Sequence, residues 1–294
     1  MDYSSFIESQ LFSVKGMTCI VTGRGTGIGK GMAAALILNG TKETADELTK
    51  AGARAQFAGR CIPIEGDVAT KKGVSDVYEK IANLTDRLDY LVNNAGFSTN
   101  WRKQCPNLVD INDPVGLEEQ LWSIEDSDFA NMTAIHCAGP DFVAVKCIPL
   151  FKNSDNPSVC NITSLAAHLF NRAVCEYSYG QSKAAEVHLN RLMAAGLLPY
   201  KIRCNSVCSG LFRSQLTTGT ADSDAPLWPP MQRATEEAIP ARRAGKWEEI
   251  AGAVLMLASP AGAYFNEAER RKTDGQEVVI DGGWRLCASA KDAK

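Results

Sequence analysis

Short apolar runs rich in β-branched residues alternate along the chain with longer segments of helical periodicity. Such alternation is typical of an α/β fold with a parallel sheet. We therefore expect a doubly wound parallel sheet with helices on both faces. The predicted strands are 17–22, 61–64, 88–92, 158–162, 201–205 and 277–280, and the predicted helices lie near 28–39, 42–52, 71–83, 125–151, 177–196 and 246–258.

The length of the chain favours a single domain, 1–294. At 294 residues it is close to the size at which one hydrophobic core stops growing, and we find no internal repeat or long Gly/Ser linker. Two stretches, 97–123 and 211–240, interrupt the alternation of elements. Irregular stretches of this length in a compact domain are usually functional or disordered.

Charge and composition argue against several classes of partner. The chain has 31 Lys and Arg against 34 Asp and Glu, a net charge of −3, and so offers no positive field to a nucleic acid. No stretch approaches the roughly 18 uncharged apolar residues of a membrane helix, and the N-terminus lacks the basic start and apolar run of a signal peptide. We expect a cytoplasmic protein that binds neither nucleic acid nor membrane.

The cysteines and histidines do not predict a metal site. Ten cysteines are scattered without a CxxC pair, which indicates small core residues in a reducing compartment. The three histidines, His136, His168 and His188, are far apart in the sequence and form no ligand pattern. We therefore expect no bound metal.

A glycine-rich turn follows the first predicted strand and leads into a helix. Gly23, Gly27 and Gly29 fit the spacing TGxxxGxG, a relative of the dinucleotide turn GxGxxG. Glycines let backbone N–H groups approach a pyrophosphate, whose charge is favoured at a helix N-terminus. A structural turn without a ligand is the alternative for this motif taken alone.

Tyr179 and Lys183 are four residues apart at the start of a predicted helix, on one face of it. A phenol has a pKa near 10, and an ammonium close by lowers that pKa because it favours the phenolate. Such a phenol is suited to proton transfer to a carbonyl while a hydride moves from a nicotinamide. A solvated surface pair is the alternative.

Polar residues also stand at the ends of two other predicted strands. Ser164 follows the strand 158–162 and could donate a hydrogen bond to a carbonyl oxygen, with Thr163 less favoured by position. Asn93, Ala95 and Gly96 follow the strand 88–92, where small residues would let a ribose or nicotinamide lie against the backbone. Because strand ends in parallel sheets face the ligand crevice, we expect both groups there.

In this order, TGxxxGxG, Asn-Asn-Ala-Gly, the strand-end serine and YxxxK resemble the short-chain dehydrogenase/reductase family over about 14–283. Within that family the chain is similar to reductases of β-ketoacyl or polyketide-type ketones in fungal-like secondary metabolism. The segments that carry this second likeness are 241–245, 257–264 and 281–283.

The resemblance implies a Rossmann-like fold and a role for each motif. Residues 14–165 would form the dinucleotide-binding half, and 166–283 would supply the catalytic helix, a substrate lid at 211–240 and the last strand. Tyr179 would be the acid/base, Lys183 would bind the ribose hydroxyls and Ser164 the carbonyl. The implied cofactor residues are Gly23, Arg24, Gly27, Ile28, Gly29, Asp67, Asn93, Ala95, Gly96, Tyr179, Lys183, Leu211 and Ser214. NADPH is the implied cofactor, NADH being less favoured, and a homodimer or homotetramer is the implied assembly.

The chain departs from the family pattern at several points. No second strand follows the helix ending near residue 39, and 53–60 is a poor substitute. Arg24, Lys30 or Arg60 would then have to read a 2′-phosphate. His136 stands where the family has an asparagine that holds a proton-relay water. With an ordinary pKa of about 6.5 it could carry a proton itself, or it could be a core histidine satisfied by a backbone carbonyl.

These observations predict an NADPH-dependent reductase that converts a ketone on an apolar small molecule to a secondary alcohol. Tyr179 would donate the proton, Ser164 would steady the oxygen, and Lys183 with His136 would reprotonate Tyr179. The alternative is a non-redox protein of the same fold, a binding, scaffold or isomerase-like protein, with an impaired cofactor site.

Overall fold

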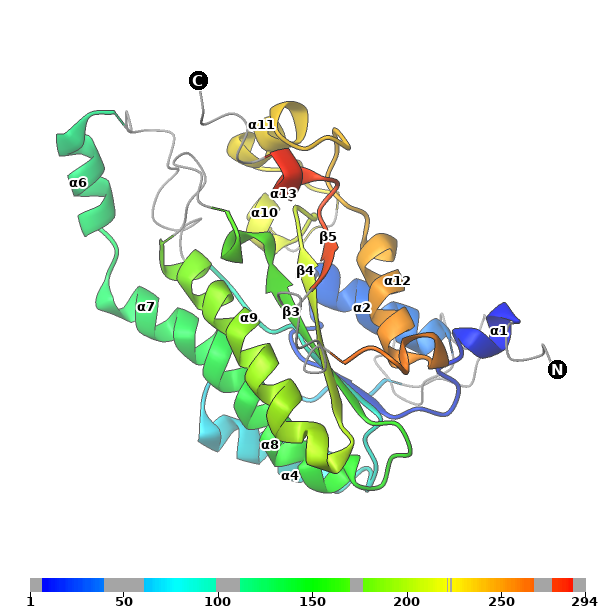
Figure 1. The fold of residues 1–294 in the computed structure, drawn as a ribbon. Helices are drawn as coiled ribbons and strands as arrows, with labels where there is room; N and C mark the ends of the chain where they lie inside the picture. Colours follow the sequence, from blue (N-terminus) through cyan, green and yellow to red (C-terminus); the bar gives the residue numbers. More distant parts are fainter. Residues whose placement is uncertain are drawn as a thin grey trace.

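Five parallel strands form one sheet in the computed structural model, which describes residues 7–39, 61–98, 112–169, 177–220, 222, 224–266 and 277–287. The strand order follows the chain, and the register pairs Ile20 with Leu91 and Ser164 with Ser209. The predicted α/β class and parallel sheet are therefore confirmed (Figure 1). The strands are β1 (Cys19–Val21), β2 (Tyr90–Asn93), β3 (Ser158–Ser164), β4 (Arg203–Ser209) and β5 (Val278–Ile280).

The predicted strand at 61–64 is wrong, because these residues join no strand. Pro63 lies in this segment and has no N–H to donate to a ladder. The residues in which we found no second strand, 40–60, lie outside the described part of the chain, as does the helix predicted at 42–52.

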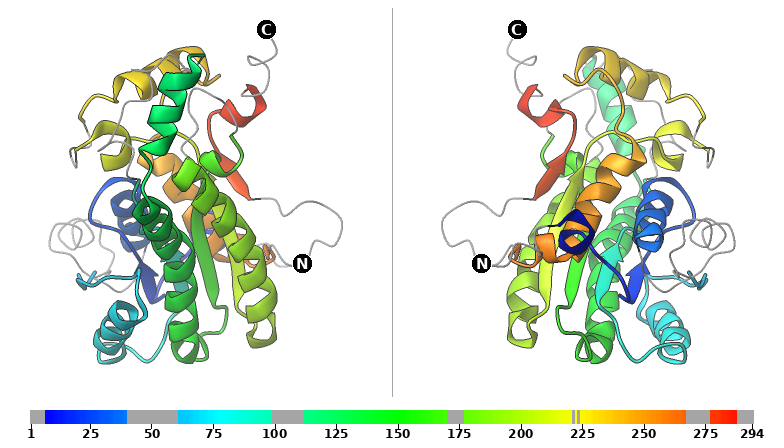
Figure 2. Two further views of the ribbon diagram at one scale, coloured as in Figure 1. Left: turned by 90° about the vertical axis from the view of Figure 1, so that its left-hand side faces the viewer. Right: turned by 90° about the vertical axis from the view of Figure 1, so that its right-hand side faces the viewer.

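Helices cover both faces of the sheet, and β2 shows how its residues serve both (Figures 1 and 2). Tyr90 and Val92 pack in a cluster with residues of α2 and α12, whereas Leu91 packs in a cluster with residues of α4, α8 and α9. This follows from the alternation of side chains along a strand. The helices are α2 (Gly27–Leu38) and α12 (Trp247–Ala258) on one face, and α4 (Lys71–Ala82), α8 (Gly139–Phe151) and α9 (Tyr177–Leu197) on the other.

A continuous helical run extends through α7 (Asp126–Thr133), the π-helical turn η3 (Ala134–Ala138) and α8. By length and composition alone its 26 residues could cross a membrane, but half of its most apolar window is buried within the fold. The run packs against α9 through α7 and η3, and against α4 through α8. It therefore has the character of a core helix, and its π-turn carries His136.

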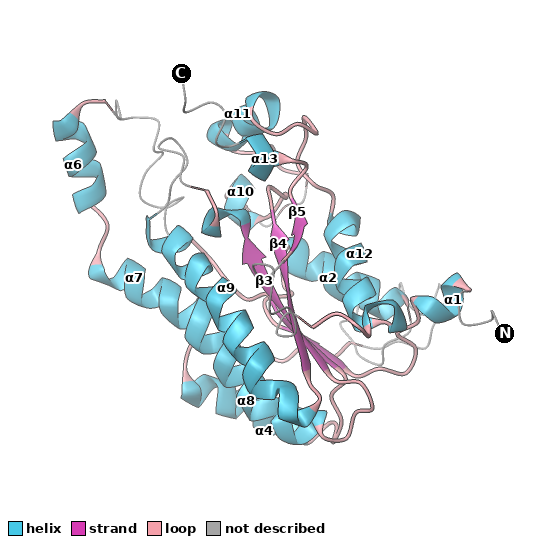
Figure 3. Cartoon of the chain, viewed as in Figure 1, coloured by secondary structure: helices cyan, strands magenta, loops and turns pink. Residues whose placement is uncertain are grey.

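Short helices and loops gather beyond the carboxyl ends of the strands, where they cap the sheet (Figure 3). Three of the helices lie in the stretches predicted to be irregular: α6 within 97–123, and α10 and α11 within 211–240. The short elements of this cap are α6 (Pro114–Trp122), η4 (Leu165–Ala167), α10 (Gln215–Thr218), α11 (Pro229–Glu237) and α13 (Trp284–Cys287). Three others lie elsewhere: η5 (Leu198–Tyr200) precedes β4, and α1 (Glu8–Leu11) contacts η6 (Pro260–Gly262), which packs on α12.

Candidate active site

A cavity of about 500 Å³ opens at the carboxyl ends of the strands. This is where ligands bind in open parallel sheets. Its walls bring together the glycine turn, the end of β3, the start of α9 and part of the cap. The predicted site residues that line it are Gly23, Gly27, Ile28, Gly29, Gly96, His136, Ser164, Tyr179, Lys183, Leu211 and Ser214.

The glycine turn forms a backbone cradle in which side chains cannot be accommodated. Gly23 and Gly27 have φ values of +66° and +56°, which favour glycine. A Cβ at Gly29 would lie 2.5 Å from both Gly23 O and Asn94 Nδ2. Gly27, Ile28 and Gly29, the first residues of α2, line the cavity, and N–H groups at the start of a helix have no partner within the helix. The turn thus fits the pyrophosphate of a dinucleotide.

A hydrogen-bonded clamp joins this turn to the end of β2. Thr22 Oγ1 accepts from the backbone nitrogens of Asn94 and Ala95, at 2.9 and 3.0 Å. Asn94 Nδ2 donates to Thr22 O and Gly23 O, at 3.0 and 3.2 Å. Neither Thr22 nor Asn94 was expected to have a role, although both belong to the glycine-turn and Asn-Asn-Ala-Gly motifs.

Tyr179 and Lys183 lie together at the start of α9, and both line the cavity. Lys183 is only 6% exposed, and its Nζ lies 5.9 Å from the centre of the Tyr179 ring. Although burial lowers the pKa of Lys183, Glu186 and Tyr179 raise it, and the net direction is upward. Because the Lys183 ammonium is buried, the alternative that Tyr179 and Lys183 form a solvated surface pair is wrong.

Glu186 is a buried carboxylate that was not predicted from the sequence. It lies on the inner face of α9, 2% exposed, and its Oε2 is 2.7 Å from Lys183 Nζ. Burial raises the pKa of Glu186 to about 7; Lys183 lowers this pKa and Glu277 raises it further. The available signal was the spacing, since position 186 falls on the helix face of Tyr179 and Lys183.

His136 projects from η3 toward the cavity and is fully buried. The Ser182 hydroxyl donates to Tyr179 O at 2.7 Å, so Nδ1 of His136 must donate to Ser182 Oγ, 2.9 Å away. Nε2 is then a bare acceptor, and it has no hydrogen-bond partner among the described residues. The His136 ring meets the Tyr179 ring edge-on, with centroids 5.3 Å apart.

The protonated form of His136 is disfavoured. Burial, and then the positive charge of Lys183, lower the pKa of His136 well below its ordinary value. Of the two alternatives for His136, the backbone-carbonyl partner is wrong, and the part in proton transfer stays a prediction. At neutral pH the ring does not hold a second proton, and its partner is the Ser182 hydroxyl rather than a backbone carbonyl.

At the end of β3, the hydroxyls of Ser164 and Thr163 have different hydrogen-bond partners. The Thr163 hydroxyl donates to the Glu277 carboxylate, so its proton is not available to a substrate carbonyl. Ser164 lines the cavity, and its Oγ accepts from Ala166 N at 3.2 Å, which leaves its own O–H free to donate. The preference for Ser164 over Thr163 agrees with this arrangement.

Four predicted cofactor residues do not line the cavity. Asn93 is buried in the sheet and donates to Asn161 Oδ1 at 2.9 Å. Asp67 is exposed and accepts from Ala69 N at 2.8 Å. The other two are Arg24 and Ala95.

The residues offered as readers of a 2′-phosphate are not brought to the cavity wall. Arg24 and Lys30 do not line it, and Arg60 lies outside the described part of the chain.

The cap contributes apolar walls. Leu211, Phe212 and Met231 line the cavity as the lid prediction requires, together with Trp284 from α13. Leu227 and Trp228, two other large apolar residues of the predicted lid, do not line the cavity; Leu227 packs instead in a cluster that includes Leu165 and Cys208.

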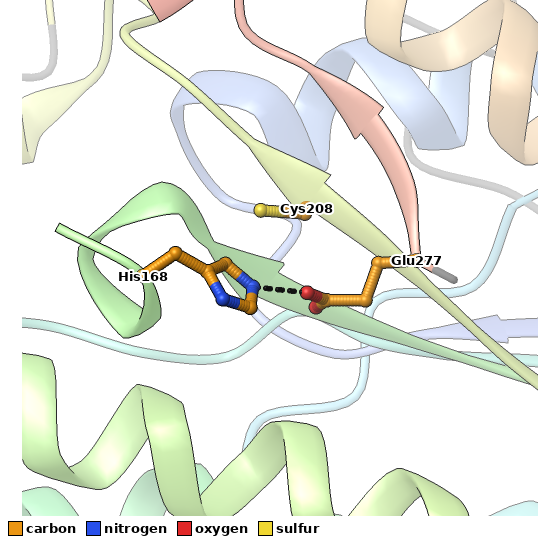
Figure 4. Close-up of side chains that lie close together, drawn as sticks. All are labelled: His168, Cys208 and Glu277. Atoms are coloured by element: carbon orange, nitrogen blue, oxygen red, sulfur yellow. Dashed lines mark hydrogen bonds and ion pairs between the residues drawn. The ribbon is translucent and has the colours of Figure 1, made fainter. Parts of the chain in front are cut away.

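His168, Cys208 and Glu277 lie close together, with Cys208 near the end of β4 and Glu277 directly before β5 (Figure 4). Glu277 is 2% exposed as a side chain and pairs with Nε2 of His168, while its other oxygen accepts from Thr163. One ligand-type atom from each of the three lies within 4.8 Å of the others. The spacing of histidines in the sequence did not predict this grouping, in which Glu277 is hydrogen-bonded to His168 and Thr163.

Comparisons with known proteins agree with this geometry. A family model described as Enoyl-(Acyl carrier protein) reductase matches residues 23–285. Short-chain dehydrogenase/reductase PhomF of Diaporthe leptostromiformis is 34% identical, over 95% of this chain and 94% of its own length. The rhamnolipids biosynthesis 3-oxoacyl-[acyl-carrier-protein] reductase of Pseudomonas aeruginosa is 30% identical, over 94% of this chain and 98% of its own. The solved Pseudomonas aeruginosa RhlG/NADP active-site complex has a TM-score of 0.71 and 28% identity, covering 94% of this chain and 99% of that one.

Proposed function

The chain belongs to the short-chain dehydrogenase/reductase family of oxidoreductases, and on this premise we propose that it uses NADPH to reduce a ketone on an apolar small molecule. The product would be a secondary alcohol. The observation that carries the proposal is the buried Lys183 beside Tyr179, in the same cavity as the glycine cradle.

Each group of the cavity wall has a part in this reaction. Bound NADPH would supply a hydride to the carbonyl carbon. Gly23, Gly27 and Gly29 would hold its pyrophosphate, and Lys183 would donate to its ribose. Tyr179 would give a proton to the carbonyl oxygen, and the Ser164 O–H would stabilise the charge that develops there.

His136 would support Tyr179 as a neutral acceptor. Its Nε2 is buried and has no hydrogen-bond partner among the described residues, and a buried acceptor without a hydrogen bond destabilises the fold. A water bonded to Nε2 would lie near Tyr179 and could return a proton to the phenol after turnover. Because the imidazolium is disfavoured, His136 would hold this water rather than store a charge.

The choice of cofactor and substrate rests on the relatives and on the cavity wall. The RhlG structure is described as an NADP complex, and the relatives include a 3-oxoacyl reductase. In this chain Leu165, Leu211, Phe212 and Met231 give the cavity apolar walls, which suit a ketone carried on an apolar body.

The test has two arms, cofactor binding and turnover. We expect NADPH to quench tryptophan fluorescence and to raise the melting temperature, since a ligand at 100 times its Kd stabilises the fold by about 2.7 kcal/mol. Tyr179→Phe should bind NADPH as the unchanged protein does and lose about 10²-fold or more in the reduction of β-ketoacyl and aromatic ketones. The exposed Tyr177, two residues earlier on α9, provides the matched control Tyr177→Phe.

The outcome also separates the redox enzyme from a non-redox protein of the same fold. If neither NADPH nor NADH binds at millimolar concentration, the proposal fails. If Tyr179→Phe keeps full turnover, the role of Tyr179 fails.

We also propose a homodimer or homotetramer. Phe129, Val145 and Leu192 are large apolar side chains exposed on α7, α8 and α9. Light scattering after size exclusion would test this, and a monomer at micromolar concentration would contradict it.

A further inference from the structure

Glu186 competes for the ammonium on which the proposed site depends. An ammonium has three N–H donors. Lys183 Nζ uses one for Ile162 O at 3.0 Å and one for Glu186 Oε2 at 2.7 Å. One donor is then left for the ribose hydroxyls. The negative charge of Glu186 also opposes the positive charge that reaches the Tyr179 phenol.

The stability of the fold does not by itself explain a carboxylate at this depth. Taking a charge out of water is costly, and an apolar side chain of similar volume in place of a buried ionic group is often neutral or stabilising. Glu186 nevertheless lies on the inner face of α9, among buried residues such as Val187. A role in the chemistry of Lys183 would account for it.

The charged and titratable groups around Glu186 come from three elements. On α9 they are Lys183 and, beyond it, Tyr179. From η3, Cys137 lies close to both members of the pair, and burial raises the pKa of its thiol to about 11, so it stays neutral. From the residue before β5, Glu277 adds a negative charge, and its carboxylate accepts from Thr163 and pairs with His168. Figure 4 shows the pair with His168.

We propose that Glu186 is a positioning residue that draws the Lys183 ammonium back and offsets its charge, so that the Tyr179 phenol stays protonated and poised as a proton donor. This inference rests on the function proposed above. A protonated Tyr179 favours the rate of ketone reduction, because reduction requires Tyr179 to start as the proton donor.

The sign of the effect follows from the charges. While Glu186 is ionised, the Lys183–Glu186 pair has no net charge and does little to favour the phenolate. When Glu186 is protonated or replaced by a neutral residue, the ammonium acts alone and the phenol ionises at lower pH. An opposite charge within about 4–6 Å changes a titration midpoint by 1 unit or more.

Glu186→Gln tests the inference, because its amide oxygen can still accept from Lys183 while the charge is gone. The phenolate of Tyr179 is read from the ultraviolet absorbance of the NADPH-bound protein after subtraction of the same titration of Tyr179→Phe. We expect the midpoint of Tyr179 to fall by about one pH unit in Glu186→Gln. The alkaline limb of kcat/KM for ketone reduction should fall by the same amount.

Two variants control for a structural role. Glu186→Asp keeps the charge and should restore most of the original midpoint. Glu79→Gln removes a carboxylate from the exposed face of α4 and should leave the midpoint unchanged. A midpoint in Glu186→Gln that is unchanged or higher overturns the inference, even if the variant is less stable.

The titration also separates this inference from the proposed function. If the unchanged protein fails to bind NADPH, the function fails first. If it binds NADPH and reduces ketones while Glu186→Gln leaves the Tyr179 midpoint in place, only the role of Glu186 is lost.

Discussion

Replacing Thr22 by valine should weaken both the fold and the cofactor cradle, because one hydroxyl holds two chain segments together. Thr22 Oγ1 accepts from the backbone nitrogens of Asn94 and Ala95 at 2.9 and 3.0 Å. Valine has nearly the same shape and no acceptor, so both N–H groups lose this partner. A hydrogen bond contributes a net 0.5 to 1.5 kcal/mol, which makes the expected loss about 1 to 3 kcal/mol.

The loss can be expressed as a melting temperature. An unfolding entropy of about 2.1 cal/mol/K per residue over 294 residues makes 1 kcal/mol worth about 1.6 °C. Thr22→Val should therefore melt roughly 2 to 5 °C lower. It should also bind NADPH more weakly, since part of the binding energy must then order the glycine turn, and each 1.4 kcal/mol so used raises Kd about tenfold.

Thr22→Ser is the matched control, because it keeps the acceptor and loses only a methyl group. Urea unfolding and NADPH titration of the two variants side by side give the comparison. If Thr22→Val equals Thr22→Ser in both stability and Kd, the clamp does not hold the turn and the reasoning is wrong.

Three further outcomes follow from buried groups elsewhere in the fold. Arg203→Met should lose about 2 to 4 kcal/mol in urea unfolding with an unchanged Kd for NADPH, because the buried guanidinium donates to the carbonyls of Gly262 and Leu257 far from the cradle. His136→Asn should lessen acid sensitivity. The pKa of His136 is lowered in the folded protein, so the stability that the neutral imidazole contributes is present above pH 6.5 and is lost as the pH falls, by about 1.4 kcal/mol per pH unit. If the urea midpoint shifts equally between pH 7 and pH 5 in the unchanged protein and in His136→Asn, this prediction is contradicted. Burial raises the pKa of the Cys147 thiol to about 12, so iodoacetamide at pH 8 should modify the exposed Cys287 and spare Cys147 in peptide mass mapping.

The sequence predicted the elements and motifs that depend on local pattern. Five of the six predicted strands and the long helices at 125–151 and 177–196 are present because periodicity reports which side chains are buried. The glycine turn and the pair Tyr179 and Lys183 line the cavity because their spacing fixes their geometry within one turn or one helix face. The cap was predicted only as an interruption, because short helices there leave little periodic signal.

What the sequence did not predict depends on contacts between distant residues or on a single step of register. Glu277 meets His168 across 109 positions, and no local pattern indicates such a pair. Asn93 and Asn94 are neighbours, but successive strand residues point to opposite faces, so one step decides which lines the cavity. The motif was correctly placed, and the side chain chosen within it was wrong.

The inner face of α9 shows why a core can retain polar groups that a stability argument alone would remove. Ser182 is bonded to His136, Lys183 to Ile162 O, and Asn190 to Asn161. An apolar face could slide or rotate against β3 and remain well packed, whereas these bonds are satisfied together in one register. Because a buried polar group left without a partner costs about 1 to 3 kcal/mol, each of them penalises displacement of the helix. The same face carries Tyr179, so the groups that are costly to bury also fix the position of the phenol.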